Sequence, residues 1–128
     1  MRLLLDTQIV LWALTDSPRL GALAHDLIVD PTNEIHVSTA SIWEIAIKHA
    51  LGRGDMPVSG ARAAELCSQA GYRELPVSWR HAALIDKLPP LHGDPFDRIL
   101  IAQAGAEPMR LLSRDAVLTG YGGMVMAV

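Results

Sequence analysis

Short apolar runs alternate with longer segments of helical periodicity along the whole of this 128-residue chain. The first run, Leu3 to Leu5, is unbroken and ends at an acid, Asp6, as expected for a strand that is covered on both faces. Similar runs recur at residues 35–37, 74–77, 109–112 and 124–127. This order of elements is typical of α/β proteins. We therefore expect a three-layer α/β/α fold in which a central parallel sheet lies between two layers of helices.

Capping residues mark where the helices between these runs begin and end. Ser17 followed by Pro18 predicts the start of a helix that continues to about Val29, because Ser is a favoured N-cap and Pro a favoured first helical residue. Gly52 is placed to end another helix. The expected helices span residues 9–14, 17–29, 38–51, 59–70, 78–85 and 94–106.

Composition narrows the classes of protein further. A chain of 128 residues, 50% of them hydrophobic, can form one domain with its own core, and we expect residues 1–128 to be that domain. Because Cys67 is the single cysteine, the chain has no internal disulfide and no cysteine-based zinc site. The apolar run at the N-terminus is too short for a signal peptide or a membrane span. We therefore expect a cytoplasmic protein without a membrane partner.

Two acidic residues lie just beyond predicted strands. Asp6 follows the first strand directly, and Asp115 lies three residues beyond Leu112. Ligands of parallel α/β sheets bind at the carboxyl ends of the strands, so these two carboxylates are candidates for a functional site. Aspartates in such places are also common helix caps and turn residues, and this interpretation stays open for each of them.

A third acid, Glu44, lies inside the helix that follows the second strand. At about 100° per residue, Glu44 and Lys48 fall outside the apolar face of that helix. Periodicity alone therefore favours an exposed ion pair between residues i and i+4 over a role in a site. The apolar face predicted for this helix consists of Trp43, Ala46, Ile47 and Ala50.

A fourth acid, Asp97, shares a helical face with the apolar residues Ile101 and Ala104. A carboxylate on a buried face needs a partner, so Asp97 is a stronger candidate than Glu44. The preceding Asp94 and Pro95 form a regular helix start. We therefore assign Asp94 mainly to N-capping, and a catalytic role for it stays open.

If Asp6, Glu44, Asp97 and Asp115 converge, their negative charges repel one another unless a cation neutralises them. Mg²⁺ is the natural cation for oxygen ligands, with Mn²⁺ as a possible substitute. Such a centre binds phosphate and activates water for in-line displacement. It would also allow a chain with a formal net charge of −3 to attract a polyanion.

Four segments of the chain, taken in order, resemble the PIN domain and more narrowly the VapC-type toxins of bacterial toxin–antitoxin pairs. Each segment alone is a weak pattern, whereas four in this order span nearly the whole chain and are far more specific. The segments are Leu4-Leu5-Asp6-Thr7, residues 41–48 (SIWEIAIK), residues 94–104 (DPFDRILIAQA) and Ser113-Arg114-Asp115.

The resemblance implies roles for the residues at matching positions. Asp6 and Asp97 correspond to direct magnesium ligands. Glu44 and Asp115 complete the acidic site. Thr7 would contribute a hydroxyl to the water network around the metal.

The resemblance also implies a substrate and partners. The family implies a magnesium-dependent endoribonuclease in which water attacks the phosphodiester, leaving a 5′-phosphate and a 3′-hydroxyl. Arg98 and Arg114 would then contact the RNA backbone, although an outward-facing arginine is the more ordinary explanation for each. Neutralisation by a VapB-like antitoxin, whose C-terminal segment packs over or near the acidic pocket, and a homodimer are implied as well.

Two other classes of protein compete with this interpretation. Phosphatases of the haloacid dehalogenase type also place an aspartate after the first strand. They need a second aspartate two positions later, where this chain has Gln8, and their lysine would have to be Lys48 or Lys87. The second alternative is a catalytically silent PIN-like binding module, which the intact set of four acids argues against.

The histidines, tryptophans and cysteine are interpreted as structural. The histidines lack the paired spacing of a zinc site, so we expect surface or packing roles for them. Trp12, Trp43 and Trp79 fall in helical patterns and are read as core or interface anchors, with Trp12 a candidate for dimer or antitoxin packing. Cys67 is read as a small buried apolar residue. The histidines are His25, His36, His49, His81 and His92.

Overall fold

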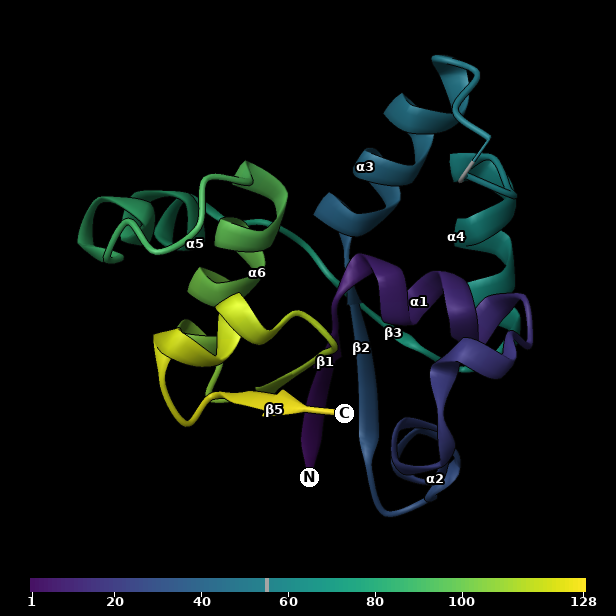
Figure 1. The fold of residues 1–128 in the computed structure, drawn as a ribbon, viewed down its shortest axis with the longest axis horizontal. Helices are drawn as coiled ribbons and strands as arrows, with labels where there is room; N and C mark the ends of the chain where they lie inside the picture. Colours follow the sequence, from purple (N-terminus) through teal and green to yellow (C-terminus); the bar gives the residue numbers. More distant parts are fainter. Residues whose placement is uncertain (55) are drawn as a thin grey trace.

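The computed structural model describes residues 1–54 and 56–128 and contains a five-stranded sheet in which every strand pair is parallel (Figure 1). The strand order is β3-β2-β1-β4-β5. This confirms the predicted parallel α/β architecture. The strands are β1 (Arg2–Leu5), β2 (Glu34–Ser38), β3 (Arg73–Leu75), β4 (Arg110–Ser113) and β5 (Val125–Ala127).

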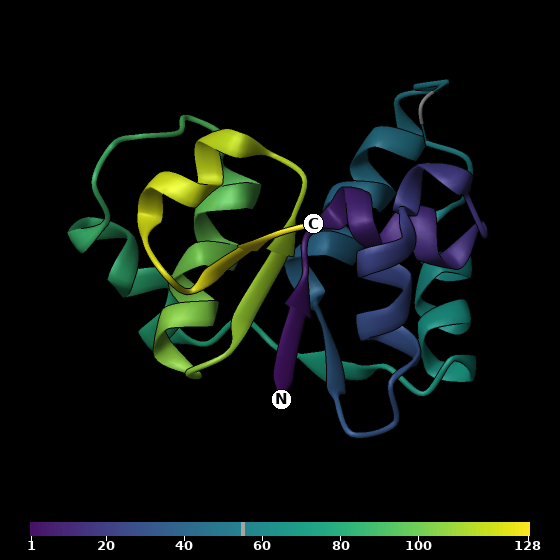
Figure 2. The same ribbon diagram turned by 60° about the horizontal axis from the view of Figure 1, so that its bottom comes forward.

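Helices follow the strands and cover both faces of the sheet, as Figures 1 and 2 show from two directions. The α-helices are α1 (Thr7–Leu14), α2 (Ala22–Val29), α3 (Thr39–Ala50), α4 (Gly60–Gln69), α5 (Trp79–Ala83) and α6 (Pro95–Ala106). Short 3-10 helices are η1 (Pro18–Leu20), η2 (Leu84–Lys87) and η3 (Ala116–Tyr121). The last of these was not anticipated from the sequence.

The alternation of side chains along β1 divides the core into two halves. Leu3 and Leu5 pack in one apolar cluster with residues of α1 and α2 and with Cys67 of α4. Leu4 points to the opposite face and packs with Leu100 of α6. Because β1 is covered on both sides, the unbroken leucine run is explained, and the three-layer arrangement is confirmed.

The segment predicted as one helix from Ser17 to Val29 is two helices, so this prediction was wrong. Ser17 does cap a helix, but that helix is the single turn η1. Gly21 then adopts a φ of 79° before α2 begins. A Cβ at this position would lie 2.8 Å from Nη2 of Arg114, so glycine permits both the left-handed backbone and the close approach of the arginine.

The strand order creates a switch point between β1 and β4. The chain runs from β1 to β2 and β3 on one side and returns to β4 on the other. Leu5 is in register with Leu112, and the backbone N–H of Asp6 donates to the carbonyl of Leu112 at 3.1 Å. The loops that leave β1 and β4 therefore separate just beyond these residues. In parallel α/β sheets such a point is where ligands bind.

No helix in the described part of the chain has both the length and the apolar character needed to cross a membrane.

Helices α3 and α4 pack closely because Gly60 faces Ala46. A Cβ at position 60 would lie 2.6 Å from Cβ and 3.2 Å from Cα of Ala46. Beside this contact, Ile45 and Ala63 belong to a small apolar cluster. The position of α3, and with it that of Glu44, therefore depends on a small residue at the start of α4.

We predict that Gly60→Ala lowers the free energy of unfolding by about 1–3 kcal/mol, because the added methyl group overpacks the contact with Ala46. Ala46→Gly alone should cost about 1 kcal/mol through helix propensity. The double variant should be more stable than the sum of the two single effects, as measured by denaturant unfolding. Strictly additive effects would contradict the proposed contact.

Candidate active site

Asp6 lies at the switch point, at the end of β1, and is 6% exposed. It caps α1, since Oδ1 accepts the backbone N–H of Ile9 at 2.9 Å. Its Oδ2 accepts the hydroxyl of Ser113 at 2.5 Å. Burial raises the pKa of Asp6, while these two hydrogen bonds lower it, and the charges of Asp115 and Glu44 raise it further. The carboxylate is thus rigidly held in a place that disfavours its charge.

Glu44 does not lie on an exposed helix face, so the periodicity-based interpretation was wrong in this respect. Glu44 is 6% exposed, whereas Trp43, predicted for the buried face, is 62% exposed. The faces are exchanged because α3 packs against α1 and α4 through Ser41 and Ile45, whereas Trp43 and Ile47 face outward. Sequence periodicity identifies apolar stripes but does not say which neighbour covers them.

The predicted pair of Glu44 with Lys48 does form, but around a buried carboxylate. Nζ of Lys48 donates to Oε2 of Glu44 at 2.5 Å. The other oxygen, Oε1, is buried and has no hydrogen-bond partner among the described residues. An unpaired buried carboxylate oxygen is energetically costly, so it is a position at which a ligand is expected.

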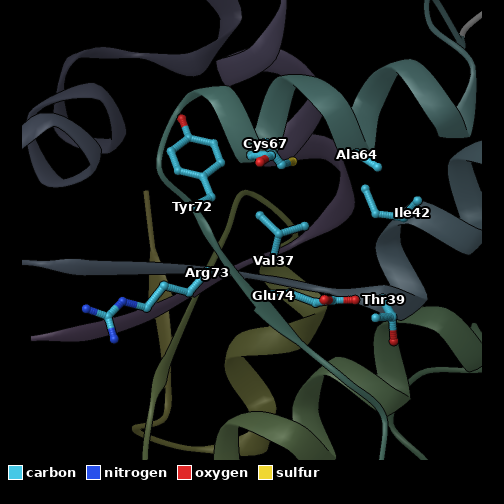
Figure 3. A pocket seen from close by; sticks show the side chains of 9 residues that line it. Val37, Thr39, Ile42, Ala64, Cys67, Tyr72, Arg73 and Glu74 are labelled. Carbon is cyan, nitrogen blue, oxygen red and sulfur yellow. The ribbon is translucent and has the colours of Figure 1, made fainter.

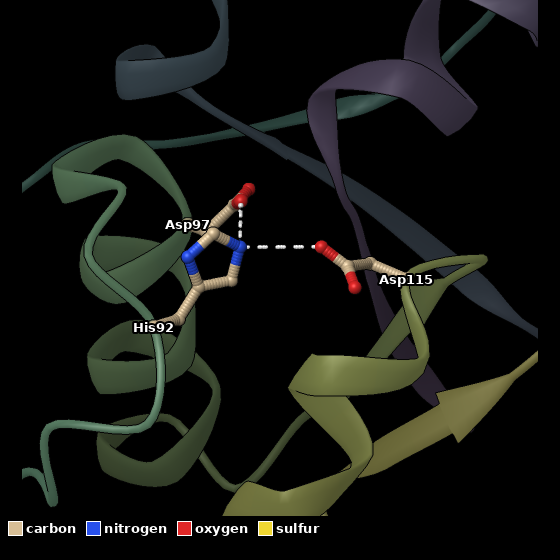
Figure 4. Close-up of side chains that lie close together, drawn as sticks. All are labelled: His92, Asp97 and Asp115. Atoms are coloured by element: carbon tan, nitrogen blue, oxygen red, sulfur yellow. Dashed lines mark hydrogen bonds and ion pairs between the residues drawn. The ribbon is translucent and has the colours of Figure 1, made fainter.

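Asp97 and Asp115 approach each other from opposite sides of the site. Asp97 lies in the first turn of α6, and Asp115 caps η3 by accepting the N–H of Val117 at 2.9 Å. Figure 4 shows the ring of His92 between them: Nε2 is 3.1 Å from Oδ2 of Asp97 and 3.2 Å from Oδ2 of Asp115. These three residues could hold a metal ion together.

The environment of Asp97 disfavours its ionised form. Burial, and to a lesser extent the charges of Asp94 and Asp6, raise its pKa to about 7, against a lowering effect of His92. Asp94 itself caps α6, accepting the N–H of Phe96 at 2.8 Å, as predicted. Several acids therefore share one site without enough compensating positive charge from the protein.

The four predicted acids, Thr7 and Arg114 all line one cavity of about 340 Å³. The hydroxyl of Thr7 donates to Oγ of Ser41 at 3.0 Å, which orients its side chain. The guanidinium of Arg114 stacks 5.3 Å from the ring centre of Trp12, at the exposed rim of the cavity. The structure thus brings together six of the seven residues chosen from the sequence.

Arg98 is the seventh, and it is not among the residues that line this cavity. Its Nη1 donates to the carbonyl of Pro89 at 3.1 Å and to the hydroxyl of Tyr121 at 3.2 Å. Nη2 donates to the carbonyl of Ile85 at 3.4 Å. The guanidinium therefore holds the segment before α6, and its predicted contact with RNA stays a prediction.

His92 is the site residue that sequence reasoning missed. It was predicted to have a surface or packing role, yet its ring lies between two of the predicted acids. The spacing to Asp97 was a usable signal, because His92 stands five residues earlier in a loop that must turn back onto α6. The histidine spacing of a zinc site gives no sign of this role, because the partners of His92 are the carboxylates of Asp97 and Asp115.

A second cavity, of about 250 Å³, lies between α4 and the sheet and contains Cys67 (Figure 3). Burial raises the pKa of the Cys67 thiol to about 11, so the thiol stays protonated. Its wall includes apolar side chains such as Val37 and Ile42. This agrees with the interpretation of Cys67 as a small buried apolar residue, and the cavity carries no chemistry comparable to that of the acidic site.

The family model of the PIN domain matches residues 3–123 of the chain, so this protein belongs to the PIN domain family. The haloacid dehalogenase alternative is thereby set aside. A comparison with curated protein sequences found no significant match.

Several solved structures share the fold. VapBC2 from Rickettsia felis, bound to a DNA fragment from its promoter, matches with a TM-score of 0.72 and 13% identity, over 100% of this chain and 98% of the other. FitAcB from Neisseria gonorrhoeae matches with a TM-score of 0.63 and 21% identity, over 98% and 95%. FitAB bound to an IR36 DNA fragment matches with a TM-score of 0.61 and 20% identity, over 98% of this chain and 94% of the other. At these identities the likeness shows the fold.

We predict that, in the absence of divalent ions, the protein loses stability as the pH rises from about 4 to about 7. Unfolded Asp97 releases its proton near pH 3.8, whereas folded Asp97 retains it to about pH 7. The contribution of Asp97 to the free energy of unfolding is therefore fully present below pH 3.8 and is lost as the pH rises through about 7. The ionised group at pH 8 costs at most about 4 kcal/mol.

Thermal unfolding in EDTA at pH 5 and pH 8 tests this expectation. Asp97→Asn should raise the unfolding midpoint at pH 8 by roughly 5–10 °C and flatten the pH dependence. Asp26→Asn is the control, because Asp26 is exposed and lies outside the site. The same pH dependence in wild type and Asp97→Asn would show that Asp97 is not strained by its neighbours.

Proposed function

We propose that this PIN domain is a metal-dependent endoribonuclease of the VapC toxin type. The observation that carries the proposal is the convergence of Asp6, Glu44, Asp97 and Asp115 in one cavity at the switch point of the sheet. Such a density of buried and half-buried acids is destabilising in the free protein. Such a cluster of acids is expected where a protein binds a cation together with a phosphate, because the cation neutralises the acids.

The residues of the cavity fit a divalent cation. The unpaired Oε1 of Glu44 is a buried oxygen without a partner, and the pKa values of Asp6 and Asp97 are raised. Carboxylate oxygens suit Mg²⁺, and Mn²⁺ is the natural substitute. We propose Asp6 and Asp97 as direct ligands, with Glu44 and Asp115 acting through water and Thr7 supporting that water network.

The chemistry follows from this arrangement. A bound divalent ion would supply the positive charge that attracts a phosphodiester and lowers the pKa of the attacking water. Glu44 and Asp115 are then placed to accept the proton of that water. Arg114, at the rim of the cavity, is placed to contact the backbone of an RNA strand. The products would be a 5′-phosphate and a 3′-hydroxyl.

We further propose that a VapB-like antitoxin covers this site, as the toxin–antitoxin context of the structural neighbours favours. The acidic cavity adjoins a hollow along α1, because Gln8 and Leu11 line both. That hollow also contains Trp12, whose half-buried ring offers an apolar contact. An extended segment of the antitoxin could therefore reach from Trp12 into the acidic site. We expect the pair to act in the cytoplasm.

An apolar groove supports the proposed homodimer. It is a groove of about 670 Å³ whose lining includes Trp43, Val77, Ile85, Phe96 and Ile99. Trp43 and Phe96 make an edge-to-face contact with ring centres 5.4 Å apart. A two-fold interface must be self-complementary, and an apolar surface meets this condition without matching charges. We therefore propose that a second copy of the chain covers this groove.

We predict that the purified protein cleaves RNA from a mixed pool with Mg²⁺ and does not cleave it with EDTA. Asp97→Asn should lower the cleavage rate by more than about 100-fold, because replacing a direct ligand costs more than replacing a neighbour of a ligand. Glu44→Gln should also cause a large loss with little change in stability. Gel analysis of the RNA and unfolding curves of each variant provide the measurement.

Wild-type activity in folded Asp97→Asn would reject the assignment of the site. A folded wild type that binds Mn²⁺ but cuts nothing in the pool points to a narrow RNA target. A protein that neither binds the ion nor cuts RNA is the catalytically silent binding module.

For the dimer, we predict that Trp43→Ser raises the dissociation constant by about 30-fold or more, as expected for an aromatic residue central to an interface. Trp79→Ser is the matched control, because Trp79 is 95% exposed and is not among the residues lining the groove. Sedimentation velocity over a range of concentrations measures both variants. A monomeric wild type, or equal effects of the two substitutions, would contradict the assignment.

A further inference from the structure

Hydrogen bonds hold both the backbone and the ring of His92 in place. Its backbone N–H donates to the hydroxyl of Tyr121 at 3.0 Å, and its Nδ1 accepts the N–H of Asp94 at 3.1 Å. Nη1 of Arg98 donates to the carbonyl of His92 at 3.4 Å and to the same Tyr121 hydroxyl. Asp94 is in turn fixed as the cap of α6. This degree of orientation exceeds what a loop residue needs for packing.

The hydrogen bond at Nδ1 determines what the other ring nitrogen can do. A nitrogen that accepts a hydrogen bond carries no hydrogen, so the hydrogen of the neutral ring is on Nε2. Nε2 faces Oδ2 of Asp97 and Oδ2 of Asp115. It is therefore a donor toward these carboxylates. Metal ligation through Nε2 would require the hydrogen to move to Nδ1 and the bond to Asp94 to break.

We propose that His92 is a positioning residue of the metal centre: its Nε2–H holds Asp97 and Asp115 in the orientation in which they receive a divalent ion, and Arg98 and Tyr121 hold His92 in turn. This inference rests on the proposed metal-dependent function. The two carboxylates come from separate elements, α6 and the turn after β4, and repel each other. A donor shared between them limits their separation. Carboxylate ligands of metals are commonly oriented by such outer hydrogen bonds.

The role assigned to Arg98 also follows. The sequence resemblance gave Arg98 a contact with RNA, whereas its hydrogen bonds connect the loop before α6 to Tyr121 of η3. These are the two elements that carry His92 and, at its N-cap, Asp115. Arg98 thus stabilises the site by holding the loop that carries His92 against η3, without lining the acidic cavity itself.

Binding of Mn²⁺, measured by electron paramagnetic resonance without RNA, tests the proposal. We expect His92→Ala to weaken Mn²⁺ binding by about 10- to 100-fold. His92→Gln should restore most of the affinity, because its amide N–H is placed near the position of Nε2. Tyr121→Phe should weaken binding by a smaller factor, since it removes the hydroxyl that holds the His92 backbone. Nitrogen modulation of the bound Mn²⁺ signal should show no directly coordinated nitrogen in the wild type.

His81 provides the matched control. It is buried, its Nδ1 also accepts a backbone N–H, from Ser78 at 3.0 Å, and its Nε2 also faces a carboxylate, that of Glu107 at 2.6 Å. It lies away from the acidic cavity, so His81→Gln should change stability without changing Mn²⁺ affinity. An equal loss of affinity in His81→Gln and His92→Ala would assign the effect to general destabilisation and overturn the proposal.

Other results separate this proposal from the proposed function. Unchanged or tighter binding in folded His92→Ala would overturn the positioning role and leave the metal site in place. A directly coordinated nitrogen that disappears in the His92 variants would make His92 a ligand and also overturn it. No Mn²⁺ binding by the wild type would overturn the metal-dependent function itself, and the positioning role with it.

Discussion

The gathering of buried and half-buried carboxylates beyond the carboxyl end of β1 is the constraint on which the rest of the site depends. Asp6 is fixed there by the backbone of α1 and by Ser113, so it cannot turn away from its neighbours. Burial disfavours its charge, and each further acid adds repulsion. A fold that keeps such a group must neutralise it, either through hydrogen bonds or through a cation. The site is therefore built at a cost in stability that ligand binding can offset.

Ion pairs and hydrogen bonds from the surrounding protein compensate the negative charge of the four acids only in part. Lys48 contacts one oxygen of Glu44, and His92 lies between Asp97 and Asp115. The remaining oxygen of Glu44 has no partner among the described residues. The loop before α6 is as important as the acids, because it carries His92 and is tied to η3 through Arg98 and Tyr121. In this view the segment from His92 to Arg98 is one structural unit rather than a cap followed by a catalytic residue.

The hollow containing Trp12 and the apolar groove beside Trp43 differ in how close they lie to this site. The hollow containing Trp12 shares Gln8 and Leu11 with the acidic cavity, so a partner there would be placed to compete with RNA. The groove beside Trp43 and Phe96 has no lining residue in common with the acidic cavity, so a second copy of the chain could occupy it while the site stays open. This separation allows association and inhibition to use different surfaces of one small domain, which is consistent with the proposed toxin–antitoxin function.

Local sequence signals determined much of this protein: the buried β1 strand, the helix cap Asp94, and the candidate acids Asp6, Asp97 and Asp115. These features depend on residues that are close together in the chain, so they can be predicted from the amino-acid sequence. Which face of α3 is buried, the break at Gly21, the place of His92 and the internal role of Arg98 were decided by the tertiary structure. Each depends on contacts between separate elements, such as α1 with α3 or His92 with Asp115. Periodicity shows which residues of a helix share a face, but only packing decides which face meets the core.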